Sequence, residues 1–116
     1  MIVATPTTAD GQSATSWGKA HWVGVAEFAP GAEGPEVRAW QIHEVAWDES
    51  HDAGTHGSHH ARIVRFLKDQ GVQAVVVDHM GDGMRRVMNT MGIPLLPASP
   101  GDAQASVLAA VAAATN

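Results

Sequence analysis

Short apolar runs separated by turn-forming residues make up the first part of the chain. Met1–Ala4 is one such run, and Trp22–Phe28 is a longer one that ends before a proline and a glycine. Glycine and proline also interrupt residues 32–35, so Trp22–Phe28 and Val37–Trp47 are predicted to form an antiparallel hairpin. Neither face of Val37–Trp47 is uniformly apolar, which predicts a strand at the edge of a sheet or beside a site.

The middle of the chain changes from a polar segment to helical and then to strand-like spacing. Residues 48–58 show no apolar periodicity and are rich in Asp, His, Gly, Ser and Thr, so they are predicted to form a loop. From His59 the apolar side chains recur with helical spacing until Gly71, which is a typical helix stop. Val72–Val77 is continuously apolar and predicts a central parallel strand that is covered on both faces.

The last third of the chain predicts two more helices and one more strand. The turn Asp78–Gly83 leads into a helix that ends at Gly92, followed by a buried strand at Ile93–Leu96 and a helix from about Asp102 to Ala113. The element order is therefore β, β, β, α, β, α, β, α. This order predicts an α/β sandwich in which an antiparallel N-terminal part joins a parallel C-terminal part through right-handed crossovers.

Composition narrows the range of functions. The chain of 116 residues fits one domain, residues 1–116, and has no cysteine, which excludes disulfides, zinc ribbons, thiol nucleophiles and cysteine-ligated clusters. The net charge is -5 and the basic residues form no long run, so nucleic acid is not an expected partner. The N-terminus lacks a signal-like pattern and Val107–Ala114 is too short to cross a bilayer, so we expect a cytoplasmic protein without membrane association.

Five of the seven histidines lie between residues 51 and 83, and four of them lie within ten residues. Around the predicted helix start, spacings of three and four residues place side chains on one face, and the positive end of the helix dipole disfavours imidazolium. Asp48, Glu49 and Asp52 lie just upstream and offer oxygen ligands. The predicted metal ligands are His51, His56, His59 and His60. The alternative is a solvated polar loop, and since no spacing matches a zinc signature, the metal is left open.

A second candidate site follows the strand Val72–Val77. Ligands of open α/β sheets gather at the carboxyl ends of parallel strands, and a glycine-rich turn at a helix start exposes N–H groups that suit an anion or the sulfides of a cluster. The predicted cofactor-binding residues are Asp78, His79, Met80, Gly81 and Gly83. The alternative is a tight strand-to-helix turn. Met84, Met88 and Met91 are expected in the core, because they share the inward face of a short amphipathic helix.

Three segments together resemble a known family. They are SWGKAHWVGVAEF, the His-rich HGSHH, and GVQAVVVDHMGDGMRRVMNTMGIPLL. The chain resembles the dinitrogenase iron–molybdenum cofactor biosynthesis family, which includes NifX-like and NafY-like carriers and the C-terminal domain of NifB proteins. The resemblance implies a ribonuclease-H-like three-layer α/β/α fold with a mixed five-stranded sheet whose second strand is antiparallel to the rest. It also implies a small carrier of an iron–sulfur-type or iron–molybdenum-type cofactor or precursor, whose partners are that cofactor and a protein that donates or accepts it.

The chain departs from the family pattern in two respects. Trp17 stands where phenylalanine is common, an aromatic exchange that preserves packing. Because cysteine is absent, any cluster must be held by His, Met, carboxylate or backbone groups. The family is also widespread outside nitrogen fixation, so the resemblance does not imply a nitrogenase role.

Two other classes of function compete with a carrier. A metal-dependent hydrolase of the ribonuclease-H-like class needs several acidic residues around divalent metals, but the first strand has none and only Asp78 ends a central strand. A metal-free interaction module would use the hairpin and the tryptophans to bind a protein. The favoured hypothesis is a binding protein that is not an enzyme, and we assign no catalytic residue.

Overall fold

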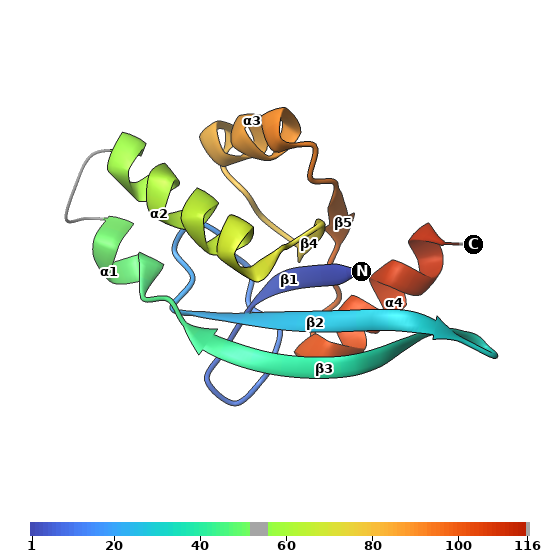
Figure 1. Ribbon diagram of the computed structural model, residues 1–116. Helices are drawn as coiled ribbons and strands as arrows, with labels where there is room; N and C mark the ends of the chain where they lie inside the picture. Colours follow the sequence, from blue (N-terminus) through green and yellow to red (C-terminus); the bar gives the residue numbers. More distant parts are fainter. Residues whose placement is uncertain (52–55, 116) are drawn as a thin grey trace.

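The protein is built on a mixed five-stranded sheet with strand order β3-β2-β1-β4-β5 (Figure 1). The computed structural model describes residues 1–51 and 56–115, except for the side chains at positions 51 and 56. The strands are β1 (Ile2–Thr7), β2 (Trp22–Gly31), β3 (Gly34–Glu44), β4 (Ala74–Val77) and β5 (Leu95–Pro97). The helices are α1 (Trp47–His51), α2 (His56–Gln70), α3 (Asp82–Met91) and α4 (Ala103–Ala114).

Strand directions follow the predicted pattern. β2 pairs antiparallel with both β1 and β3, whereas β1, β4 and β5 pair in parallel. The second strand is therefore antiparallel to the other four, which confirms the mixed sheet expected from the resemblance. β3 lies at one edge, as its two-sided polar pattern predicted.

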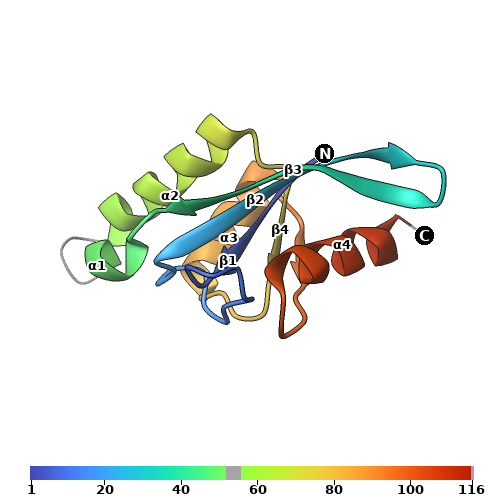
Figure 2. The same ribbon diagram turned by 90° about the horizontal axis from the view of Figure 1, so that it is seen from below.

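Helices cover both faces of the sheet and give three layers (Figures 1 and 2). α2 and α3 lie on one face and α4 lies on the other. Consecutive residues of β4 alternate between the two cores, because Val75 and Val77 pack with the α2 and α3 side and Val76 packs with the α4 side. Each such valine contributes about 1.5 to 3 kcal/mol through burial. The α/β prediction is therefore confirmed, and a ribonuclease-H-like layering agrees with this arrangement.

The predicted loop over residues 48–58 is wrong in the part that the structure describes. Trp47–His51 forms α1, and α2 begins at His56 instead of His59, while residues 52–55 lie outside the described residues. Trp47 anchors α1: its side chain is 3% exposed and packs edge-to-face on Trp17, with ring centroids 5.1 Å apart. A helix of one turn held by one buried side chain has no periodicity for a sequence pattern to detect.

The strand predicted over Val37–Trp47 ends earlier, at Glu44. The N–H groups of Val45 and Ala46 both donate to the carbonyl of His21, and Ala46 has a φ of 52°. This left-handed residue turns the chain out of the sheet and into α1. The end of β3 is thereby fixed to the segment that precedes β2.

Helix ends agree better with the sequence. The Asp102 side chain accepts a hydrogen bond of 2.8 Å from the N–H of Ala105 and caps α4, and Gly92 follows α3 in the left-handed conformation with φ 72°. No helix within the described ranges is long and apolar enough to span a membrane.

Candidate functional site

A cavity of about 310 Å³ lies where the carboxyl end of β4, the start of α2 and the start of α3 meet. Its lining residues are Ser16, Gly18, Lys19, His59, His60, His79, Gly81, Asp82, Gly83 and Met84. The wall therefore combines imidazoles, a lysine and the first turn of a helix.

Backbone hydrogen bonds fix His79 in this wall. The N–H of His79 donates to the carbonyl of Thr15 at 2.9 Å, and the N–H of Trp17 donates to the carbonyl of His79 at 3.1 Å. Ser16 and His79 form an isolated parallel bridge, which continues the sheet by one residue pair beyond β4. This bridge brings the segment before β2 to the end of β4 and positions both Ser16 and His79 beside the cavity.

His59 is held more tightly than a solvent-facing ligand would be. Its side chain is buried, at 5% exposure, and its Nε2 lies 2.8 Å from the carbonyl oxygen of Gly18. Because a carbonyl only accepts, Nε2 must carry the proton in this hydrogen bond. The bond fixes the ring orientation and joins the start of α2 to the segment before β2.

His60 lies against the first turn of α3. A Cβ atom at Gly83 would approach the Cε1 of His60 to 2.9 Å, so the absence of a side chain at position 83 makes room for this imidazole. The ring centroid of His60 is 6.2 Å from that of His59. α3 begins after Gly81, which supplies no side-chain cap, so the first N–H groups of the helix keep their partial positive charge at the cavity.

The structure brings some of the predicted site residues together and separates others. The cavity that is lined by His59, His60 and His79 is also lined by Gly81 and Gly83, so the His-rich segment and the strand-end turn border one cavity. Asp78 lines a different cavity of about 210 Å³, with Ser13, Thr15 and Ser99.

Met80 is buried in the core at 4% exposure, and the side chains of His51 and His56 lie outside the described residues. Met84 and Met88 are buried as predicted, although Met84 also reaches the cavity.

Sequence reasoning missed the contribution of the segment before β2. Ser16, Gly18 and Lys19 line the cavity, and Lys19 brings a positive charge to it. These residues lie about 40 positions upstream of the His-rich segment, in a stretch with no periodic pattern. The signal for these residues in the sequence is the segment SWGKAH, which is part of the family resemblance.

A second group of polar side chains surrounds His21, outside this cavity. The Nε2 atom of His21 lies 2.6 Å from a carboxylate oxygen of Glu44, and its Nδ1 lies 2.8 Å from one of Asp48. The hydrogen bond to Glu44, and next that to Asp48, raises the pKa of His21 above its usual value of 6.5. Ligand atoms of His21, Asp48 and Glu49 lie within 4.8 Å of one another. Asp48 and Glu49, expected beside the clustered histidines, thus converge on a histidine that the sequence had not marked.

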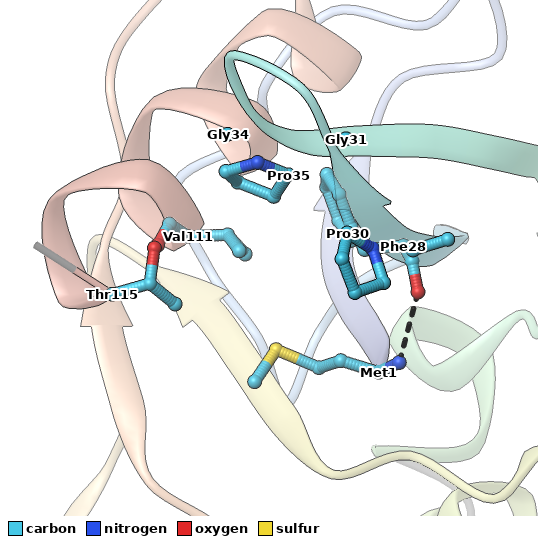
Figure 3. A pocket seen from close by; sticks show the side chains of 9 residues that line it. Met1, Phe28, Pro30, Gly31, Gly34, Pro35, Val111 and Thr115 are labelled. Atoms are coloured by element: carbon cyan, nitrogen blue, oxygen red, sulfur yellow. Dashed lines mark hydrogen bonds between the residues drawn. The ribbon is translucent and has the colours of Figure 1, made fainter.

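A larger apolar cavity of about 360 Å³ lies at the other end of the sheet, between the β2–β3 hairpin and α4 (Figure 3). Phe28, Pro30, Pro35 and Val111 face it, together with Met1, whose amino group donates to the Phe28 carbonyl at 3.0 Å. Its described lining has no imidazole or carboxylate. The histidine cavity, although smaller, is therefore the better candidate for metal chemistry.

Comparisons with known proteins identify a family and support the fold. A family model described as dinitrogenase iron-molybdenum cofactor matches residues 1–114. The crystal structure of PH0822 superposes with a TM-score of 0.69 at 21% identity, over 94% of this chain and 87% of the other. The crystal structure of a candidate dinitrogenase from Methanocaldococcus jannaschii superposes with a TM-score of 0.60 at 15% identity, over 92% and 84% of the two chains. At these identities the two structures support the fold alone. Curated protein sequences give no significant match.

Proposed function

Because the chain belongs to the dinitrogenase iron-molybdenum cofactor family over residues 1–114, we propose that it binds and carries a metal cofactor or its precursor. The observation that supports this proposal most directly is the convergence of His59, His60 and His79 with the start of α3 on one cavity. Family membership supports cofactor binding in general. The ligand residues and the kind of cargo are our proposal.

The chemistry of the cavity suits an anionic metal cluster. Neutral imidazole is a good ligand for iron and neighbouring transition metals, and His60 and His79 are the proposed ligands. The uncapped N–H groups of α3 and the ammonium of Lys19 favour negative charge, which the sulfides of an iron–sulfur-type or iron–molybdenum-type cluster provide. His59, bonded to Gly18, serves to position the wall.

The absence of cysteine favours a carrier that holds its cofactor transiently over a protein that binds it permanently. Thiolates are the usual permanent ligands of iron–sulfur clusters, and the chain has none. A cluster held by two imidazoles and backbone N–H groups is bound more weakly and exchanges more readily. Such a site suits a carrier that receives a cofactor from one protein and passes it to another.

A hydrolytic function is less well supported. Two-metal hydrolysis requires several carboxylates around the metals, and the described lining of the cavity includes one, Asp82. Asp78 lines the separate cavity beside Ser99. We therefore propose binding without catalysis and assign no catalytic residue.

The test is anaerobic loading with Fe(II) and sulfide, measured by the visible absorption of the bound cluster and by iron content. Parent protein is expected to retain the cluster after gel filtration, and His60→Ala/His79→Ala is expected to bind it at least about tenfold more weakly. His43→Ala is the matched control, because it removes an imidazole that does not line this cavity. Equal retention by the parent and the double variant would reject the cavity as the cluster site. Parallel titrations with Fe(II), Zn(II) and Ni(II) identify bare metals that bind.

A further inference from the structure

The polar group around His21 has the composition of a metal site of its own. It lies where the segment before β2, the end of β3 and α1 meet, and none of its members lines the histidine cavity. We propose that His21, Asp48 and Glu49 bind a divalent transition-metal cation of the zinc type, with Glu44 holding the other ring nitrogen of His21. This proposal concerns a bare cation and goes beyond cluster binding in the cavity.

The ligand atoms are close enough for one cation to join them. Those of His21, Asp48 and Glu49 lie within 4.8 Å of one another. Zinc bonds to imidazole nitrogen and carboxylate oxygen are about 2.0 to 2.2 Å long, so ligands of one zinc ion lie about 3 to 4 Å apart. Asp48 is exposed over 43% of its side chain and Glu49 is also exposed, so modest rotations bring both carboxylates into range.

Glu44 supplies the support that metal-bound histidines usually have. In most such sites the ring nitrogen that does not bind the metal donates its N–H to a carboxylate or a carbonyl, which fixes the ring. Here Nε2 of His21 is paired with Glu44 at 2.6 Å, while Nδ1 faces Asp48 at 2.8 Å. A cation bound at Nδ1 takes the place of the proton between His21 and Asp48 and leaves the Glu44 hydrogen bond intact.

The local charge favours a cation. Three carboxylates, those of Glu44, Asp48 and Glu49, surround one imidazole. Among the side chains that the structure describes, His21 forms both ion pairs, so no described lysine or arginine is paired with this group. A divalent cation would offset the mutual repulsion of the carboxylates.

The backbone around the group is already fixed. The carbonyl of His21 accepts the N–H groups of Val45 and Ala46, and the carbonyl of Ala20 accepts the N–H of Trp47 at 2.9 Å. Trp47, next to Asp48, is buried in the core. The ligands therefore start from positions held by the fold, which lowers the entropy lost on binding.

The test is a Zn(II) titration by calorimetry in the His60→Ala/His79→Ala background, which removes the imidazole ligands of the cavity. We expect one Zn(II) per chain in this background. Adding Asp48→Asn and Glu49→Gln should abolish measurable binding, and Glu44→Gln alone should weaken it about 10- to 100-fold. The control is Glu33→Gln/Glu36→Gln, which makes the same change in net charge at the hairpin tip. It should bind Zn(II) as the background does.

The result that overturns the proposal is equal Zn(II) affinity in the Asp48→Asn/Glu49→Gln variant and the hairpin control. Absence of Zn(II) binding in the background at millimolar concentration overturns it as well. Thermal unfolding in chelator checks that each variant folds, and Glu49→Gln alone keeps the test available if the double variant does not. Because cluster loading is measured separately, failure of this site and failure of the cavity as a cluster site give different results.

Discussion

At the scale of single residues, Gly83 shows how little space the cavity leaves. A methyl group at this position would meet Cε1 of His60 at 2.9 Å, whereas a methyl group at Gly81 would meet nothing within 4 Å. Both glycines line the cavity. Comparing an alanine substitution at each position therefore distinguishes a clash with His60 from a general effect of changing the turn.

Gly83→Ala is expected to displace His60 and to weaken cluster retention about tenfold, while Gly81→Ala leaves retention unchanged. Gly83→Ala should not destabilise the fold, because His60 is a side chain that can move and alanine favours a helix by up to about 1 kcal/mol over glycine. Cluster loading and urea unfolding of both variants check these outcomes. Equal retention by the two variants would contradict the role given to Gly83.

His59 and His60 are adjacent in sequence but should respond differently to substitution. His59 is buried and bonded to Gly18, so His59→Ala removes packing and leaves the Gly18 carbonyl without this donor. We expect a loss of about 1 to 3 kcal/mol in the free energy of unfolding, measured in urea. His60→Ala, at a half-buried position, should change this free energy by less than about 1 kcal/mol while lowering cluster affinity.

At the scale of elements, α1 depends on one side chain. Trp47 packs edge-to-face on Trp17 at 5.1 Å and on Phe66 at 5.5 Å, and the rest of this one-turn helix is polar. Trp47→Ala is expected to cost about 3 to 5 kcal/mol in the free energy of unfolding. Ser50→Ala, on the same helix, is the control and should cost less than about 1 kcal/mol. Chemical denaturation followed by circular dichroism measures both.

The contact between α1 and the sheet also predicts a pH dependence in metal-free protein. The folded-state pKa of His21 is raised, chiefly by Glu44 and then by Asp48, so this contact stabilises fully below pH 6.5 and is lost as pH rises through the raised pKa. An NMR titration of the His21 ring in chelator should give a pKa above 6.5. Glu44→Gln should lower that pKa more than Asp48→Asn, and the reverse order would contradict the assignment.

Helices that repeat an apolar pattern over two or more turns were predictable from the sequence, whereas the one-turn helix α1 was not. α2 and α3 carry apolar stripes and glycine stops, and β4 lies in a continuous apolar run, so their type and order follow from periodicity. α1 has one turn and one buried side chain. The contacts of His21 with Glu44 and Asp48 span 23 and 27 residues and follow from the Ala46 turn, which no pattern marks.

At the scale of the whole molecule, the geometry of the sheet determines which of the predicted site residues line the same cavity. Asp78 and His79 are neighbours in sequence, but Asp78 lines the cavity beside Ser99 and His79 lines the cavity of His60. Because both residues follow a strand, the sequence predicted both of them at the carboxyl edge of the sheet. Consecutive side chains point to opposite faces, and this alternation beyond β4 places the two residues in different cavities. The convergence of His60 and His79 required the crossover of α2 over the sheet, which sequence spacing does not give.

The bridge between Ser16 and His79 has a consequence for when the cavity forms during synthesis of the chain. The cavity wall is drawn from residues 16–19, 59–60 and 79–84, and these segments meet only once β4 has paired with β1. A ribosome-bound chain that has reached residue 70 contains His59 and His60 but lacks the strand that carries His79 and the helix that supplies the N–H groups. The cavity that we propose as the cluster site is therefore complete only after the sheet has formed.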